Sequence, residues 1–77
     1  MKPLSIGNDV YIDSNTIFCL MLTWNPKAKK LIARAKKENK FLDFTEGNGR
    51  ISIIILNTGS IIASTMLPKD IIDNMES

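Results

Sequence analysis

The first part of the chain alternates apolar residues with polar or small ones over short stretches. Residues 4–6 and 10–12 each carry an apolar side chain at every second position, which is the pattern of a half-buried strand. Between them, Gly7-Asn8-Asp9 is typical of a tight turn, because these residue types tolerate the backbone angles that a turn requires. The pattern therefore predicts two short strands joined by this turn.

Residues 16–22 form an apolar run rich in strand-forming residues, directly after the polar residues 13–15. In an extended chain, successive side chains point to opposite faces of the sheet. Those facing one way would be Ile17, Cys19 and Met21. Those facing the other way would be Phe18, Leu20 and Leu22. Because both sets are apolar, we expect a strand that is covered on both faces.

A helix is predicted to begin at Pro26. Asn25 can accept hydrogen bonds from free backbone N–H groups as the N-cap, and proline loses nothing at the first helical position. The residues that recur at helical spacing along one narrow stripe are Ala28, Leu31, Ile32, Ala35 and, less ideally, Asn39. The alanines that permit close packing on a sheet are Ala28, Ala33 and Ala35. We therefore expect an amphipathic helix whose lysines point to water.

Two strands and a glycine-rich turn follow this helix. Residues 41–45 predict a strand, and residues 46–50 tolerate the positive φ needed to turn into residues 51–56, which predicts a β-hairpin. A second turn at residues 57–59 leads into residues 60–66. The isoleucine-rich residues 51–56 are the expected central strand, since β-branched residues on both faces are favourable only where both are buried.

Pro68 opens a final predicted helix, in which Ile71, Ile72 and Met75 share one face and should dock on the sheet or on a neighbouring subunit. The pattern as a whole predicts an α+β fold with the order β-β-β-α-β-β-β-α. We expect about five to six short strands in a small mixed or antiparallel sheet. Residues 1–77 contain no linker, internal repeat or low-complexity tract, so one domain is expected.

The chain is small for a self-supporting fold, with 77 residues of which 44% are apolar. A core of this size leaves little stability after chain entropy is subtracted, so further support is usual. The single cysteine, Cys19, cannot form an internal disulfide, and a chain without histidine has no Cys/His metal cluster. Self-association is the remaining common route, and we therefore expect a homo-oligomer.

Groups that could perform catalysis are scarce. The candidates are the carboxylates of Asp13, Asp43 and Glu46 together with Cys19, and no histidine is available as a base. Cysteine inside an apolar run is usually inert, and carboxylates at strand ends usually face solvent or pair with lysine, although these three could hold a divalent ion. We therefore expect a protein that is not an enzyme and has no cofactor, metal or small-molecule substrate.

The chain contains no stretch of the roughly 18 apolar residues that span a bilayer. The first residues, Met1-Lys2-Pro3, lead directly into patterned sequence without the apolar core of a signal peptide. A lone cysteine in an apolar run agrees with a reducing compartment. We therefore expect a cytoplasmic protein that has no membrane partner.

Positive charge is concentrated in one segment, although the formal net charge of the chain is only +2. Residues 26–40 hold seven basic residues against Glu38, a net charge of +6 that leaves −4 for the rest of the chain. Such asymmetry often marks a surface that faces a polyanion, and a solubilising surface is the alternative. The lysines with almost no acidic partner one helical turn away are Lys29, Lys30, Lys36, Lys37 and Lys40.

Gly47-Asn48-Gly49-Arg50 is a second candidate for anion binding. Backbone N–H groups in a glycine-rich turn can cradle an oxyanion, and Arg50 could bind the same phosphate group. An ordinary turn is the alternative for the first three residues, whereas Arg50 projects from the predicted tip with no neighbouring partner. Trp24, between strand and helix, is expected to fill the core or a subunit contact rather than to stack on a base.

A set of residues spaced without gaps over most of the chain carries a family resemblance. These residues are Ile6-Gly7, Ser14-Asn15, Lys29, Leu31-Ile32, Ala35, Leu42-Asp43, Thr45, Gly47, Ile53 to Ile55, Ser64 and Pro68. Their order resembles the RemA-like extracellular matrix regulatory family, short bacterial proteins that include DNA-binding transcriptional regulators. The resemblance implies a homo-oligomeric ring that presents arginines around its rim, so that DNA bends along it through backbone contacts.

The chain departs from this family at its arginines. Thr16 stands where one arginine is expected, and Asn48-Gly49 replaces an arginine pair, so that Arg50 lies one position beyond the pair. DNA binding is therefore weakened, moved to Arg50 and the lysine helix, or lost.

The sequence thus predicts a transcriptional regulator that contacts the backbone of double-stranded DNA as a ring-shaped homo-oligomer. The expected DNA-contacting residues are Arg50, Asn48, Gly49, Gly47, Thr16, Lys29, Lys30, Lys36 and Lys37. The alternative is a structural or protein-interaction oligomer of the same fold that has lost DNA binding. The two differ in whether the lysine helix and residue 50 form an exposed rim or lie inside a subunit interface.

Overall fold

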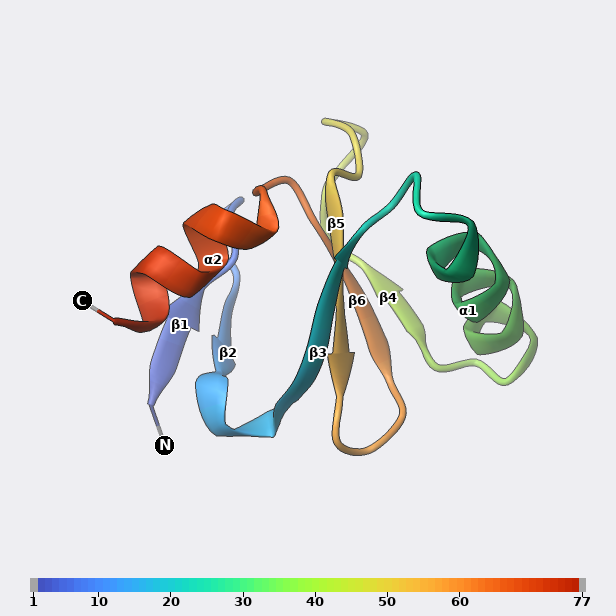
Figure 1. Cartoon of the computed structure of the whole chain (residues 1–77), viewed down its shortest axis with the longest axis horizontal. Helices are drawn as coiled ribbons and strands as arrows, with labels where there is room; N and C mark the ends of the chain where they lie inside the picture. Colours follow the sequence, from blue (N-terminus) through green and yellow to red (C-terminus); the bar gives the residue numbers. More distant parts are fainter. Residues whose placement is uncertain (1, 77) are drawn as a thin grey trace.

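A computed structural model describes residues 2–76, and Figure 1 shows its ribbon. Within these residues, six strands and two α-helices follow the predicted order, with one turn of 3₁₀ helix (Ser14–Thr16) before the third strand. The predicted α+β class is therefore confirmed. The strands divide into a two-stranded and a four-stranded sheet. No helix in the described part of the chain is long and apolar enough to cross a membrane.

The two-stranded sheet pairs β1 (Pro3–Ser5) with β2 (Tyr11–Asp13) in antiparallel register, as predicted. All three residues of the connecting turn, 7–9, adopt positive φ, which glycine, asparagine and aspartate tolerate best. A Cβ atom at Gly7 would also collide with Thr65 Oγ1. Glycine is therefore required where this turn meets the larger sheet.

The four-stranded sheet has the order β3-β5-β6-β4. Its strands are β3 (Ile17–Leu22), β5 (Ser52–Leu56), β6 (Ile61–Ser64) and β4 (Phe41–Asp43). β5 is antiparallel to both β3 and β6, and it forms with β6 a hairpin around the predicted turn at residues 57–59. The isoleucine-rich segment is therefore a central strand, as predicted.

The predicted hairpin between residues 41–45 and 51–56 is wrong. β4 pairs in parallel with β6 and not with β5, so residues 44–51 carry the chain past β6. The glycine-rich segment does turn, with positive φ at Glu46, Gly47 and Gly49. Both edges of β5 are occupied by β3 and β6, however, so β4 joins at the free edge of β6.

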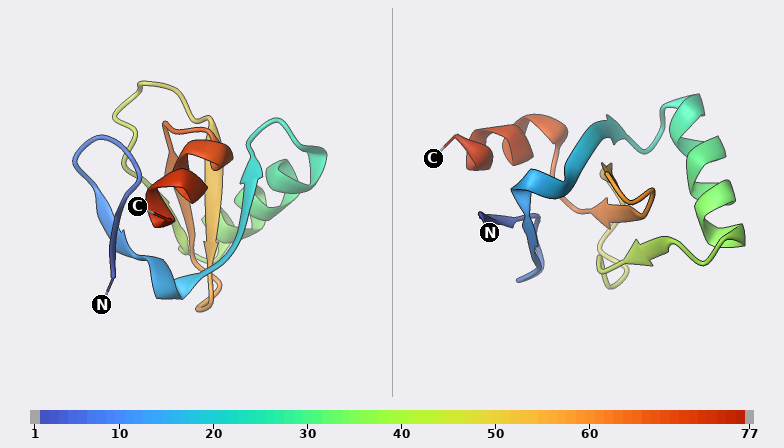
Figure 2. Two further views of the ribbon diagram at one scale, coloured as in Figure 1. Left: turned by 60° about the vertical axis from the view of Figure 1, so that its left-hand side comes forward. Right: turned by 90° about the horizontal axis from the view of Figure 1, so that it is seen from below.

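The two faces of the four-stranded sheet carry separate apolar clusters beneath α1 (Pro26–Lys37) and α2 (Pro68–Met75), which lie on opposite sides in Figures 1 and 2. The cluster toward α2 and the small sheet contains Leu4, Ile6, Ile54, Ile62 and Ile71. The cluster toward α1 contains Ala28, Ala35, Ile53 and Ile61. Ile53 and Ile54 are both fully buried. Successive residues of β5 thus join both halves of the fold.

β3 departs from simple alternation at Phe18. Its pairing with β5 shifts register between Ile17 and Cys19, and such a bulge turns the following side chains over. Ile17 and Leu20 consequently pack in the cluster toward α2, whereas Met21 packs in the one toward α1. The predicted common face of Ile17, Cys19 and Met21 is therefore wrong. β3 is nevertheless packed on both faces, as predicted, through Leu20 and Met21, and only Phe18, which is 75% exposed, lacks cover in the described subunit.

α1 begins as predicted, with Asn25 Oδ1 accepting a hydrogen bond of 2.9 Å from Lys27 N–H. Its buried residues are Ala28 and Ala35. Ala33 is exposed, because it lies off the stripe that faces the sheet, so its predicted packing role is wrong. Asn39 follows the helix with a positive φ, where it ends the helix instead of extending the apolar stripe.

α2 buries less of its apolar surface than predicted. Ile71 is fully buried, but Ile72 is 45% exposed and Met75 is 37% exposed. The helix contacts mainly β1 and β3, and this narrow contact covers one stripe of a helix. Of the two predicted docking places for this face, the sheet receives only Ile71, and docking of Ile72 and Met75 on a neighbouring subunit stays a prediction.

Candidate nucleic-acid interface

A groove of about 420 Å³ lies beside α1. The wall of the groove is formed by α1, by the segment that leads from β3 into α1, and by the residues before β5. The lining residues are Thr23, Lys29, Ile32, Ala33, Lys36 and Arg50. Three of them, Lys29, Lys36 and Arg50, are predicted DNA-contacting residues that the fold brings together across β4. We call this surface the basic groove.

The helical repeat explains why two lysines line the basic groove. Lys29 and Lys36 are seven residues apart, about two turns of α1, so their side chains leave the same side of the helix roughly 10 Å apart. Ile32 and Ala33 lie between them. Every ionisable residue of the lining is a cation. The groove therefore combines a positive potential with an apolar surface between the charges.

Two residues of β4 hold the side chain of Arg50 at the groove. Arg50 Nε lies 2.7 Å from Asp43 Oδ2, and Arg50 Cζ lies 5.1 Å from the centroid of the Phe41 ring. Phe41 and Asp43 are two residues apart on one strand, so their side chains leave the same face of the sheet. The prediction that Arg50 has no neighbouring partner is therefore wrong. The segment between β4 and β5 returns Arg50 to the strand it has just left.

Phe41 also links Arg50 to α1. Lys36 Nζ lies 5.5 Å from the centroid of the same ring, so one aromatic side chain contacts cations from two elements. The negatively polarised face of an aromatic ring attracts cations at such distances. This attraction offsets part of the repulsion between the two positive side chains. The ring therefore favours the clustering of charge that defines the basic groove.

Asp43 is itself fixed by Thr45. Asp43 Oδ1 accepts hydrogen bonds from Thr45 N–H at 2.9 Å and from Thr45 Oγ1 at 2.6 Å, and Thr45 is only 3% exposed. These two hydrogen bonds, and then the contact with Arg50, lower the pKa of the Asp43 carboxyl. Asp43 therefore stays ionised at neutral pH. Because its pKa is lower in the folded chain, the stability it contributes is present above its unfolded pKa and is lost as pH falls through the folded pKa.

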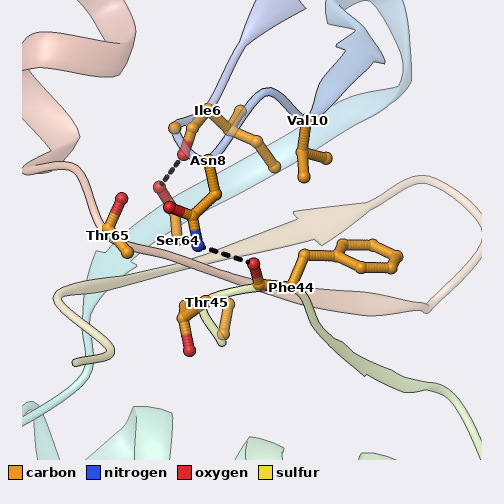
Figure 3. A pocket seen from close by; sticks show the side chains of 9 residues that line it. Ile6, Asn8, Val10, Phe44, Thr45, Ser64 and Thr65 are labelled. Atoms are coloured by element: carbon orange, nitrogen blue, oxygen red, sulfur yellow. Dashed lines mark hydrogen bonds between the residues drawn. The ribbon is translucent and has the colours of Figure 1, made fainter. Parts of the chain in front are cut away.

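The junction between the two sheets supports the end of β4. Figure 3 shows Asn8 Nδ2 donating to the Phe44 carbonyl oxygen at 3.0 Å and Ser64 Oγ donating to the Ile6 carbonyl oxygen at 2.7 Å. The side chains around these bonds leave no room for a water molecule between them. This junction is therefore a structural contact, and it ties the residues just after Asp43 to the small sheet.

The glycine-rich segment 47–49 extends from the end of β5 into solvent (Figure 1). Apart from their chain neighbours, no described residue lies within 4 Å of a Cβ position at Gly47 or Gly49. Asn48 N–H donates a 3.0 Å hydrogen bond to the Thr45 carbonyl oxygen, so this amide closes the turn. The exposed Asn48 side chain and the amides of the two glycines are the parts of the segment that could reach an anion. They adjoin the basic groove through Arg50.

Three other predicted residues lie away from the groove. Thr16 belongs to the 3₁₀ turn before β3, where its Oγ1 donates to the Asp13 carbonyl oxygen at 2.6 Å. The groove begins at Thr23, after β3 has ended, so the length of that strand separates the two. Lys30 and Lys37 are exposed on α1 but do not line the groove. One subunit therefore gathers only part of the predicted set.

The carboxylates considered for a metal site are engaged locally or lie apart. Asp13 Oδ1 accepts hydrogen bonds from Asn15 N–H at 3.1 Å and Lys2 N–H at 3.3 Å, and these lower the pKa of its carboxyl. Asp43 is held by Thr45 as described above. Between residues 2 and 76, no three His, Cys, Asp or Glu side chains lie close enough together to hold a metal ion.

Sequence reasoning missed the support of Arg50 and left two places open for Trp24. The spacing of Phe41 and Asp43 places both side chains on one face of a strand. It does not indicate that Arg50 returns to that strand and contacts them. Trp24 is 60% exposed, so the expectation that it fills the core is wrong. A subunit contact for Trp24 stays a prediction.

Residues 4–75 match the model of the RemA-like family, described as extracellular matrix regulatory protein A-like. A similar protein of Finegoldia magna is 28% identical over 69 residues, which cover 90% of this chain and 83% of the relative. One of Leptospira biflexa is 28% identical over 74 residues, covering 96% and 79%. One of Dictyoglomus turgidum is 26% identical over 76 residues, covering 99% and 89%. Each is described as a candidate regulatory protein.

Proposed function

Because this chain belongs to the RemA-like family of regulatory proteins, we propose that it regulates transcription by binding the backbone of double-stranded DNA. The basic groove is the proposed contact surface, with Lys29, Lys36 and Arg50 as its phosphate ligands. Asn48 and the amides of Gly47 and Gly49 extend that surface. The proposal also includes a cytoplasmic location and the absence of catalytic activity.

The observation that carries this proposal is the convergence of three cations in one groove that has no acidic side chain in its lining. Phosphate oxygens accept hydrogen bonds from arginine and lysine regardless of base sequence, so such a surface positions DNA without reading it. Neutralising phosphates releases condensed counterions, which supplies affinity at low salt. The proposed binding is therefore tolerant of sequence and sensitive to salt.

Self-association is the second part of the proposal. The large apolar side chains that the described subunit exposes are Tyr11, Phe18, Trp24, Leu42, Phe44, Leu67, Ile72 and Met75. A small protein with this much exposed apolar surface is expected to bury part of it between subunits. We assign the contact to the open edge of β3 at Phe18 and to the face of α2 with Ile72 and Met75. A ring would repeat the basic groove, so that weak phosphate contacts add up.

One observation favours the alternative, an oligomeric structural or interaction protein that does not bind DNA. Asp43 already pairs with Arg50, which neutralises part of the charge at the groove. In the alternative, a neighbouring subunit covers the groove, whereas in the proposed function the groove stays open at the rim of the oligomer. A duplex-binding measurement separates the two directly.

Replacing Arg50 with alanine is expected to weaken binding to a duplex of arbitrary sequence by about tenfold at low salt, because one charge-assisted phosphate contact is lost. For each subunit that contacts the duplex, the slope of log K against log salt should become less negative by about 0.9. Fluorescence anisotropy with a labelled duplex measures both. Lys69→Ala removes the same charge from α2, outside the groove, and should change the affinity by less than about twofold. Equal losses for both variants would contradict a role for the groove.

Replacing Phe18 with aspartate is expected to separate the subunits while leaving the fold intact, because this side chain is 75% exposed in one subunit and a charge there would be buried in the interface. Light scattering should give the wild type a mass several times that of the 8.6 kDa chain and give the variant a lower mass. Far-UV circular dichroism should be unchanged. A wild type with the mass of one chain would contradict the proposed ring.

A further inference from the structure

We infer that Asp43 is a positioning residue for DNA binding: with Phe41, it orients the guanidinium of Arg50 so that the outer donors point into the basic groove. This inference rests on the proposed function. Asp43 lies beside the proposed DNA site, where its negative charge alone would weaken the binding of phosphate. In the inferred role it strengthens that binding by orienting Arg50.

The two carboxylate oxygens of Asp43 accept hydrogen bonds from different residues. Oδ1 accepts two hydrogen bonds from Thr45, through its N–H at 2.9 Å and its Oγ1 at 2.6 Å. Oδ2 accepts from Arg50 Nε at 2.7 Å. Thr45 is 3% exposed, so the carboxylate is anchored to a buried residue and its plane is fixed. A fixed acceptor in turn fixes the direction of the Nε–H bond of Arg50.

Phe41 limits the remaining freedom of the guanidinium. With Arg50 Cζ 5.1 Å from the ring centroid and Nε tied to Asp43, the group is restrained at its face and at one edge. An arginine carries five N–H donors, and only the one on Nε is used by Asp43. Within residues 2–76, no hydrogen bond engages the four donors on the two Nη atoms. This is the edge of the guanidinium that can bind a phosphate with two parallel hydrogen bonds.

Preorganisation explains why such an arrangement favours binding. An exposed arginine loses rotamer entropy when it is immobilised on a ligand, and a side chain already held in place loses less. The side chain of Arg50 retains 39% exposure and that of Asp43 retains 28%, so solvent weakens the repulsion between this carboxylate and an incoming phosphate. The gain from orientation is therefore expected to exceed the cost of one added negative charge.

The test compares Asp43→Asn with Glu46→Gln. Both variants remove one negative charge close to Arg50 in sequence, and Glu46 is an exposed residue of the adjoining segment. Asparagine keeps the size of the side chain but has one oxygen, so either Thr45 or Arg50 must face an NH₂ group that cannot accept its proton. Each substitution is made in the wild type and in the Arg50→Ala variant, and binding to one labelled duplex is measured at fixed low salt.

Asp43→Asn is expected to weaken binding by about twofold to tenfold, whereas Glu46→Gln leaves it unchanged or tightens it. In the Arg50→Ala background, Asp43→Asn should cause no further loss. Wild-type affinity or better for Asp43→Asn would overturn the inference. So would an equal loss in both backgrounds, since that indicates general damage to the fold.

A second variant keeps the test decisive if Asp43→Asn does not fold. Phe41→Leu removes the ring while keeping apolar volume, and it should also weaken binding in the wild type more than in the Arg50→Ala variant; equal losses would count against positioning. A wild type that does not bind duplex DNA at all would overturn the proposed function and this inference with it. Salt-dependent binding by the wild type with tight binding by Asp43→Asn would overturn the inference alone.

Discussion

Replacing Ile54 with alanine is expected to lower the free energy of unfolding by about 2–5 kcal/mol, the range for large-to-small substitutions in a packed core. Ile54 is fully buried on the central strand β5, in the cluster that contains Leu4 and Ile6 of the N-terminal segment and Ile71 of α2. These elements reach the four-stranded sheet through this cluster. The cavity left by three missing carbon atoms would therefore loosen three parts of the fold at once. Urea denaturation followed by circular dichroism measures the loss.

Ile72→Ala is the matched control, because it removes the same atoms from a side chain that is 45% exposed. Its effect on the unfolding of separated subunits should stay below about 1 kcal/mol. Both variants are compared in the Phe18→Asp background so that subunit contacts do not contribute. Similar losses at the two positions would contradict the arrangement of the core described above.

Removing all three cations of the basic groove, as Lys29→Ala, Lys36→Ala and Arg50→Ala together, is expected to weaken duplex binding by roughly a hundredfold or more at low salt. Each lost phosphate contact makes the slope of log K against log salt less negative by about 0.9, so the triple variant should lose about 2.7 of the slope's magnitude for each subunit that contacts the duplex. The three side chains lie at the protein surface, so thermal stability should change little.

The control for this variant carries the same change in charge at lysines outside the groove, as Lys30→Ala, Lys37→Ala and Lys69→Ala. Two of these lysines lie on the same helix as Lys29 and Lys36, so the comparison separates the groove from the overall charge of α1. The control should lose only a few-fold in affinity through the weaker long-range field. A loss as large as that of the groove variant would assign binding to net charge alone.

The elements of this fold could be predicted because their signals are local. The cap at Asn25, the turn at residues 7–9 and the isoleucine-rich β5 each depend on a few neighbouring residues, and the structure confirms all three. The pairing of β4 could not be predicted this way. Glycines favour a turn after β4, but which strand comes next to β4 depends on β5 already having two partners.

The exposed positions show a second limit of sequence patterns. An apolar residue at the right spacing predicts a buried face, yet Phe18 and Ile72 are exposed. The bulge in β3 rotates Phe18 outward, and the narrow contact of α2 covers only the stripe of Ile71. Neither cause is visible in the spacing. Both residues lie on surfaces that the proposed oligomer would cover.

The part of the candidate site that lies on α1 could be predicted from helical geometry. The spacing of Lys29 and Lys36 places them on one side of α1, and positive charge without acidic partners indicates that face. Arg50 reaches them only because the chain passes β6 and returns beside Phe41 and Asp43. Arg50 contacts residues seven and nine positions earlier only because the chain crosses from β4 to β5 past β6. The glycine-rich turn signal predicts a hairpin tip at this point and so gives no indication of the crossover.

The central claim, that the basic groove binds the DNA backbone, is tested most directly by the salt dependence of duplex binding by the wild-type protein. Anisotropy titrations between about 50 and 200 mM salt should show log K falling linearly with log salt, with a slope of about −2.7 or steeper, because each engaged subunit makes three phosphate contacts. An affinity that does not change over this range, or no binding at the lowest salt, would contradict the claim.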